Sequence, residues 1–134
     1  GFQVVWVGAG DMDAQIITAI QQAVETDESV NLCNCLSFPE LIALYQRCRF
    51  FIGNDSGPMH LAAASGVPVF ALFGPSDKSI WAPLGEHSHL LSGNLCLLDD
   101  CIHCRLNHRC MESLHPEAVI EAINDKLLRE GEKT

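Results

Sequence analysis

Positive charge is scarce in this sequence. Eight lysines and arginines stand against 17 aspartates and glutamates, which gives a formal net charge of −9 at pH 7. A nucleic-acid backbone is bound through a basic surface, so the composition argues against nucleic acid as a partner. It equally argues against attachment to a membrane through a basic patch. An anionic ligand must therefore be held by local dipoles and a few cations rather than by the overall field of the protein.

Long apolar runs are also missing. No run approaches the roughly 20 apolar residues of a membrane-spanning helix, and the first residues lack the basic start of a signal peptide. The seven cysteines are odd in number, which does not favour a disulfide framework. We therefore expect a cytosolic protein with reduced thiols. Internal repeats and low-complexity segments are absent, and 48% hydrophobic residues in a chain of 134 predict a globular domain with its own core.

Apolar runs alternate with helical periodicity along the chain. The runs are short and bounded by turn residues, as in buried parallel strands, and they cover residues 4–7, 30–33, 50–53, 68–73 and, more weakly, 89–91. Helices are expected between and after them, near residues 16–24, 37–45, 58–65 and from 116 onward. Ser37 and Glu40 form a capping box, and Pro58 and Gly66 fit the two ends of their helix. This order predicts an α/β domain, a parallel sheet with helices on both faces.

The stretch GNDSGPMHLAAASG, residues 53–66, places polar side chains between two apolar elements. Parallel α/β sheets bind ligands at the carboxyl ends of their strands, where this stretch is expected to lie. The amides of Gly57, Met59 and His60 are expected to lack helical partners there, and Gly57 permits close backbone approach. Such a helix start suits a phosphate, to which His60 adds a hydrogen bond or a charge. Asp55 is placed to accept hydrogen bonds from sugar hydroxyls.

Other interpretations of this stretch stay open. In one, Asp55 or Ser56 only caps the short helix and His60 is an ordinary surface histidine. The tetrad D-S-G-P also occurs in trypsin-like proteases, but those are large all-β enzymes. In a third, residues 53–57 form a G-x-D-x-G elbow that raises Asp55 as the nucleophile of an α/β hydrolase. Pro58 weighs against this hydrolase, because it removes an amide from the place that an oxyanion hole would use.

The segment FFIGNDSGPMHLAAASGVPVFALFGPSDKSIWAPLG resembles the signature region of glycosyltransferase family 9, which includes the lipopolysaccharide heptosyltransferases. The family's patterns N-D-[ST]-G-x-x-H-x-A-A and G-x-P-x-x-x-L-F-G-P-[ST]-D are matched nearly throughout. The flanking segments LSFPELIALYQRCRF and CIHCRLNHRCMESLHPEAV are also similar to the family. The resemblance implies one half of a GT-B fold, a Rossmann-like domain that binds a nucleotide-sugar donor. It also implies transfer without a metal or other cofactor, in the cytoplasm or at the inner face of the cytoplasmic membrane.

The resemblance assigns site residues in three groups. The donor sugar is implied to contact Asp55, Ser76 and Asp77. The diphosphate is implied to bind, mostly through backbone, at Ser56, Gly57, Pro58, Met59 and His60, with Lys78 nearby. The nucleoside is implied to contact Leu36 with its base, and Asp11 or Asp13 with its ribose. ADP-heptose is the expected donor, and a glycolipid acceptor is expected on a separate N-terminal domain that also carries the catalytic base.

The family's donor-binding domain has a further strand and a basic loop before the position of Gln3, and neither is found in this sequence. We therefore expect residues 1–134 to be a single domain, a C-terminal fragment of a two-domain enzyme that is inactive alone. Without that strand the sheet is expected to split into a pair and a second group starting at Phe50. A second copy of the chain or a rearranged sheet would then cover the open edges. The alternatives are a nucleotide-sugar binding module without transfer activity, and the hydrolase with Asp55 as nucleophile.

A cysteine-rich segment follows the last expected strand. Its pattern resembles a zinc-binding loop. Cys101 and Cys104 form a C-x-x-C pair, Cys96 precedes them, Cys110 follows them, and two histidines lie between Cys101 and Cys110. Only one cysteine pair is clear, whereas a zinc site of this type has two. We favour reduced thiols that pack an irregular loop, with zinc as the alternative.

Overall fold

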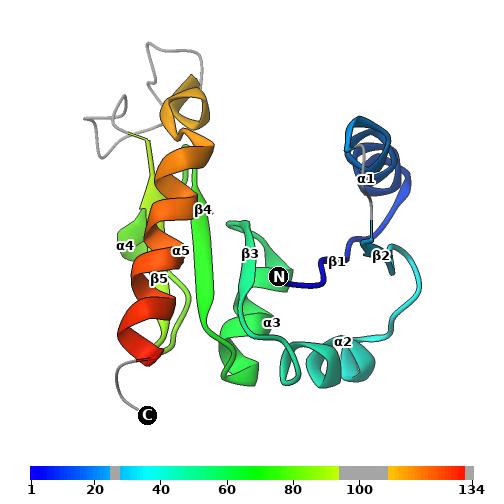
Figure 1. Cartoon of the computed structure of the whole chain (residues 1–134), viewed down its shortest axis with the longest axis horizontal. Helices are drawn as coiled ribbons and strands as arrows, with labels where there is room; N and C mark the ends of the chain where they lie inside the picture. Colours follow the sequence, from blue (N-terminus) through cyan, green and yellow to red (C-terminus); the bar gives the residue numbers. More distant parts are fainter. Residues whose placement is uncertain (25–27, 94–108, 132–134) are drawn as a thin grey trace. The chain divides into compact units, whose positions relative to one another are not determined.

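The computed structural model describes residues 1–24, 28–93 and 109–131. Parallel strands flanked by helices confirm the predicted α/β fold (Figure 1). The chain divides into two compact units, Gly1–Ala43 and Leu44–Thr134. Among the described residues, no helix combines the length and the apolar composition needed to cross a bilayer.

The first unit holds a two-stranded parallel sheet. Strand β1 (Val5–Trp6) leads into helix α1 (Asp11–Ala23), and β2 (Val30–Asn31) pairs with β1 in parallel. Both strands are shorter than the predicted runs, and the run predicted to reach Cys33 bends into a turn at residues 33–35. The apolar face predicted for α1 is also mostly uncovered: Ile17 is buried, but Ile16 remains half exposed. The expectation that the apolar runs of this unit form buried strands is therefore wrong, since β1 is only partly buried and β2 is exposed.

Helix α2 (Phe38–Tyr45) begins at the predicted capping box. The Glu40 carboxylate accepts hydrogen bonds from the Ser37 hydroxyl, at 2.5 Å, and from the Ser37 amide, at 2.8 Å. Both hydrogen bonds lower the pKa of the Glu40 carboxyl, and the one from the hydroxyl has the larger effect. One half of the predicted capping box is thus confirmed, namely the hydrogen bond from the Ser37 amide to the Glu40 carboxylate.

The second unit contains a parallel sheet in the order β3-β4-β5. Its elements in chain order are β3 (Phe51–Asn54), α3 (Gly57–Ser65), β4 (Val69–Phe73), α4 (Lys78–Trp81), β5 (Ser88–Ser92), the 3-10 helix η2 (Arg109–Ser113) and α5 (Pro116–Gly131). All three predicted strands are confirmed, the weak last one included. The short elements α4 and η2 were not predicted, because a single helical turn leaves no apolar periodicity to detect.

Strand β4 forms the centre of the core. It lies between two parallel neighbours, and Val69, Phe70 and Phe73 are almost fully buried. Helix α3 contributes Met59 and Ala62 to the same core and ends at Gly66, which adopts the left-handed φ of 87° that the sequence predicted for a glycine cap. Helix α5 runs alongside β4 and β5 (Figure 1). Among the described residues, the largest fully buried side chains, Phe70, Phe73, Met59 and Val69, therefore lie on or beside the strands from which the predicted phosphate and sugar residues leave.

Strand β3 is half exposed, although its sequence predicts a strand buried on both faces. Its residues alternate between intermediate and exposed, and Ile52 keeps 43% of its surface accessible. Within the described part of the chain β3 pairs only with β4. The predicted split of the strands into a pair and a group beginning near Phe50 is thus confirmed, while covering of the open edge by a second copy stays a prediction.

Candidate functional site

Three strand ends lie side by side in the second unit. Because β3, β4 and β5 are parallel and in register, with Asn54 opposite Leu72 and Phe73 opposite Ser92, their carboxyl ends meet at one edge of the sheet. The turn into α3 follows β3 there, and the loop 74–77 follows β4. Every residue predicted to contact the donor sugar or the diphosphate leaves from these two strands. The topology therefore brings both groups to the edge at which such sheets bind ligands.

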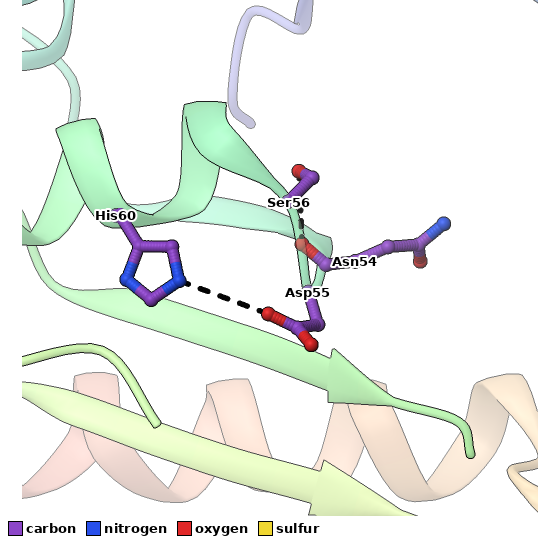
Figure 2. Close-up of polar contacts among 4 residues, drawn as sticks. All are labelled: Asn54, Asp55, Ser56 and His60. Atoms are coloured by element: carbon purple, nitrogen blue, oxygen red, sulfur yellow. Dashed lines mark hydrogen bonds and ion pairs between the residues drawn. The ribbon is translucent and has the colours of Figure 1, made fainter. Parts of the chain in front are cut away.

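Asp55 and His60 face each other at the start of α3 (Figure 2). Asp55 directly follows β3, His60 lies one turn into the helix, and Asp55 Oδ1 is 3.8 Å from His60 Nε2. At this distance the two side chains form an ion pair when the imidazole is protonated, but the separation is too long for a hydrogen bond. The side chain of His60 is 42% accessible and that of Asp55 is 15% accessible. The pair thus presents a carboxylate acceptor and an imidazole to solvent from neighbouring positions.

The first turn of α3 has no side-chain cap. Ser56 is the N-cap residue, but its hydroxyl donates to the carbonyl of Asn54 at 3.2 Å instead of accepting from the helix (Figure 2). The capping interpretation of Asp55 and Ser56 therefore finds no support in the hydrogen bonds, since no side-chain oxygen accepts from the first turn.

The amides of this turn are only partly available. Met59 and His60 both donate to the carbonyl of Ser56, at 3.1 and 3.4 Å, so the prediction that these two amides lack helical partners is wrong. The side chain of Met59 is fully buried as well, which leaves only its backbone near any ligand. The amide of Gly57, as the first of the helix, has no helical acceptor. A Cβ atom built on Gly57 would meet nothing within 4 Å, so this position faces open space.

The loop after β4 is held by its own side chains. Asp77 caps α4: its Oδ1 accepts from the Ser79 hydroxyl at 2.7 Å and from the Ser79 amide at 2.8 Å, and both hydrogen bonds lower the pKa of the Asp77 carboxyl. Lys78 Nζ donates to the hydroxyl of Ser92 at 2.7 Å, which fastens α4 to the end of β5. Ser76, in the loop between β4 and α4, is partly buried. A capping role for Asp77 was not foreseen from the sequence, although the pattern D-x-S would have indicated it.

The residues predicted for the nucleoside belong to the first unit. Asp13 accepts a hydrogen bond from the Ala9 amide at 2.9 Å, and Asp11 is exposed in the first turn of α1. Leu36, in the segment that connects β2 to α2, is partly buried. Sequence reasoning missed Asn34, whose side-chain oxygen accepts from the Gly10 amide at 2.6 Å. An asparagine between two cysteines in a turn was the available signal, since asparagine tolerates the left-handed backbone that Asn34 adopts, with φ at 61°.

The predicted zinc loop falls largely outside the described residues. Cys96, Cys101 and Cys104 are not described, and Cys110 is buried in η2. Among the residues that the structure describes, no group of three or more potential metal ligands is gathered together. Both the preference for reduced thiols and the zinc alternative stay predictions.

Known proteins match this chain over most of its length. The family model described as glycosyltransferase family 9 (heptosyltransferase) matches residues 1–108. Lipooligosaccharide heptosyltransferase 2 of Campylobacter jejuni subsp. jejuni serotype O:2 is 35% identical over 126 residues, which cover 90% of this chain and 39% of the relative. Lipopolysaccharide heptosyltransferase 3 of Escherichia coli K12 is 35% identical over 132 residues, with 97% and 38% covered.

Two solved structures share the fold. A glycosyltransferase of family 9 from Veillonella parvula DSM 2008 superimposes with a TM-score of 0.83 at 30% identity, over 96% of this chain and 37% of that one. The E. coli ADP-heptose lps heptosyltransferase II gives a TM-score of 0.82 at 29% identity, over 98% and 38%. The chain thus spans less than two fifths of the length of these proteins.

Proposed function

This chain belongs to glycosyltransferase family 9, and from that premise we propose that it is the donor-binding domain of an enzyme that moves a heptose, or a related sugar, from a nucleotide sugar to a lipopolysaccharide core or similar glycan. The names of its relatives, lipopolysaccharide and lipooligosaccharide heptosyltransferases, support the substrate class. Within the chain, the observation that carries the proposal is the juxtaposition of Asp55 and His60 at the uncapped start of α3.

The chemistry of this site divides between the sugar and the diphosphate. The Asp55 carboxylate accepts hydrogen bonds from the sugar hydroxyls, since an ionised carboxyl is an acceptor only. The Gly57 amide, the positive end of the α3 dipole and the His60 imidazole face the diphosphate. These donors stabilise the negative charge that grows on the nucleoside diphosphate as it leaves the sugar, so the transfer needs no metal in this proposal. Lys78 is fixed at the same sheet edge and adds a positive charge.

The general base is proposed to lie outside this chain, on a second domain. The relatives are more than twice as long as this chain, which leaves room for such a domain in them. Residues 1–134 are accordingly proposed to be the C-terminal domain, which binds the donor without transferring its sugar alone. The intact enzyme would work in the cytoplasm, at the inner face of the cytoplasmic membrane where its glycolipid acceptor lies.

The proposal is tested by isothermal titration calorimetry of the 134-residue chain against ADP, UDP and GDP. We expect binding of ADP, because one structural neighbour is the E. coli ADP-heptose lps heptosyltransferase II. Binding of none of the three would contradict the proposal, and preferential binding of UDP or GDP would change the donor but keep the site. Hydrolysis of a chromogenic ester that is lost in Asp55→Ala would instead favour the hydrolase with Asp55 as nucleophile.

Replacing Gly57 with alanine provides a second test. The free protein should tolerate the methyl group, since a Cβ at this position meets no atom within 4 Å, and helical alanine is more stable than glycine by up to about 1 kcal/mol. The same methyl would keep a phosphate from the Gly57 amide, so we expect ADP affinity to fall by about 1–3 kcal/mol, the value of a hydrogen bond to a charged group. Calorimetry measures the affinity and thermal melting the stability.

The matched control for Gly57→Ala is Ala64→Ser, which changes an exposed position near the other end of α3. It should leave ADP affinity unchanged. Unchanged affinity in Gly57→Ala, with a melting temperature no lower than that of the unsubstituted chain, would show that no phosphate approaches the start of α3.

A further inference from the structure

Asn34 joins the two loops at the carboxyl edge of the β1–β2 sheet. Its backbone amide donates to the carbonyl of Gly8 at 3.0 Å. Its side-chain oxygen accepts from the Gly10 amide at 2.6 Å, and its side-chain nitrogen lies 3.5 Å from the carbonyl of Gly10. One residue of the turn after β2 therefore holds both glycines of the loop after β1. Gly10 has a φ of 90° and Asn34 a φ of 61°, so both stand in the left-handed region that this arrangement needs.

The amides of Ala9 and Gly10 both donate to side chains. A glycine-rich loop between a strand and a helix commonly binds phosphate through free backbone amides. Here the Ala9 amide donates to the carboxylate of Asp13 and the Gly10 amide to the side chain of Asn34. The Asp13 carboxylate also fills the space over Gly8, where a Cβ atom would come within 2.8 Å of it. An anion beside Gly8 would meet the Asp13 carboxylate, and the Ala9 and Gly10 amides already donate to side chains, so this loop is unfavourable for phosphate.

The backbone amides in the turn that carries Asn34 are hydrogen-bonded as well. The Cys33 amide donates to the side chain of Asn31 at 3.0 Å, and the Cys35 amide donates to the carbonyl of Leu32 at 3.1 Å. The α3 start in the second unit differs, because no side-chain oxygen accepts from its first turn. The two strand ends therefore differ: the Ala9 and Gly10 amides donate to side chains, whereas the Gly57 amide at the start of α3 has no helical acceptor.

We infer that Asn34 is a positioning residue for nucleoside binding by the first unit: it occupies the Gly10 amide and fixes the loop 8–10 against the turn that precedes Leu36. The inference rests on the proposed function, because it takes a nucleoside diphosphate as the ligand. Leu36 and Asp11 leave from the two joined segments, so their backbone positions are set before the ligand arrives. A ribose and a base are suited to such a surface, since ribose hydroxyls donate to carboxylates and a base packs on an apolar side chain.

Two variants separate the side chain from the backbone. Asn34→Gly keeps the left-handed backbone accessible but removes both side-chain contacts to Gly10. Asn34→Asp keeps an oxygen acceptor for the Gly10 amide and should restore the loop. The matched control is Asn31→Ala, which removes a side-chain acceptor from the Cys33 amide in the same turn but does not touch the loop 8–10.

The experiment measures three quantities on the 134-residue chain: calorimetric affinity for ADP, calorimetric affinity for inorganic diphosphate, and amide hydrogen exchange of Ala9 and Gly10 by NMR. In Asn34→Gly we expect about a 3- to 10-fold loss of ADP affinity, the equivalent of one net hydrogen bond, with unchanged diphosphate affinity and faster exchange at Gly10. Asn34→Asp should recover the ADP affinity, and Asn31→Ala should retain it. General destabilisation would weaken both ligands together, so the difference between them identifies positioning.

Equal losses for ADP and diphosphate, or unchanged exchange at Gly10 in Asn34→Gly, would overturn the inference. Unchanged ADP affinity in that variant, with normal binding by the unsubstituted chain, would also overturn it and would leave the proposed function intact. Binding of neither ligand by the unsubstituted chain would contradict the proposed function, and the exchange of the Gly10 amide would then decide by itself whether Asn34 holds the loop.

Discussion

Replacing Asp55 with alanine in the full-length enzyme is expected to reduce sugar transfer by at least about 100-fold while leaving ADP affinity nearly unchanged. The Asp55 carboxylate is proposed to hold hydroxyls of the donor sugar, and ADP has no such sugar. Without that contact the anomeric carbon is no longer held in line for attack, so the loss appears in kcat as well as in KM. Transfer is measured by release of ADP in the presence of acceptor, and ADP affinity by calorimetry.

Asp55→Asn is the informative partner variant, because it keeps the size of the side chain and removes its charge. It should recover part of the transfer rate. Asp125→Ala is the matched control, since Asp125 is exposed in α5 and lies outside the proposed site. Loss of ADP binding in Asp55→Ala would show that Asp55 serves the nucleotide and not the sugar. A lower melting temperature with normal kinetics would instead indicate that the role of Asp55 is purely structural.

Replacing His60 with alanine is expected to weaken both ADP binding and transfer, by about 1–3 kcal/mol, or roughly 5- to 150-fold. His60 is one turn into α3, its imidazole is partly accessible, and Asp55 lies 3.8 Å away. When it is protonated, the imidazole donates from both nitrogens and can therefore bind an anion with one of them. Because ADP carries the diphosphate, the loss should appear with ADP alone, which distinguishes this residue from Asp55.

The matched control is His87→Ala, which changes an exposed histidine at the opposite edge of the same sheet. The carbonyl of His87 accepts from the amide of Val69, the first residue of β4, so His87 lies at the amino ends of the strands. Its replacement should leave ADP affinity unchanged. If His60→Ala bound ADP as tightly as the unsubstituted chain, the diphosphate would not lie at the start of α3.

The sequence alone determined the elements around the site, because their signals are local. The apolar run before Gly53, the proline in the first turn of α3 and the glycine at its end predict where β3 stops and where α3 begins and ends, and Gly66 adopts the expected left-handed backbone. The order of these elements placed the motif at the carboxyl edge of a parallel sheet. The spacing of Asp55 and His60, five positions apart across a strand–helix junction, already brought their side chains to one side of that edge.

Tertiary structure decided which polar groups remain available there. Asn34 reaches Gly10 across 24 residues, and Lys78 reaches Ser92 across 14, and no local pattern contains either contact. The exposure of α1 and β3 likewise depends on which strands lie beside them, and an apolar sequence does not specify its neighbours. A side chain or amide binds a ligand only when no nearer group has satisfied it. The sequence therefore predicts the candidate residues, and packing between distant segments decides which of their polar groups keep no hydrogen-bond partner and can bind a ligand.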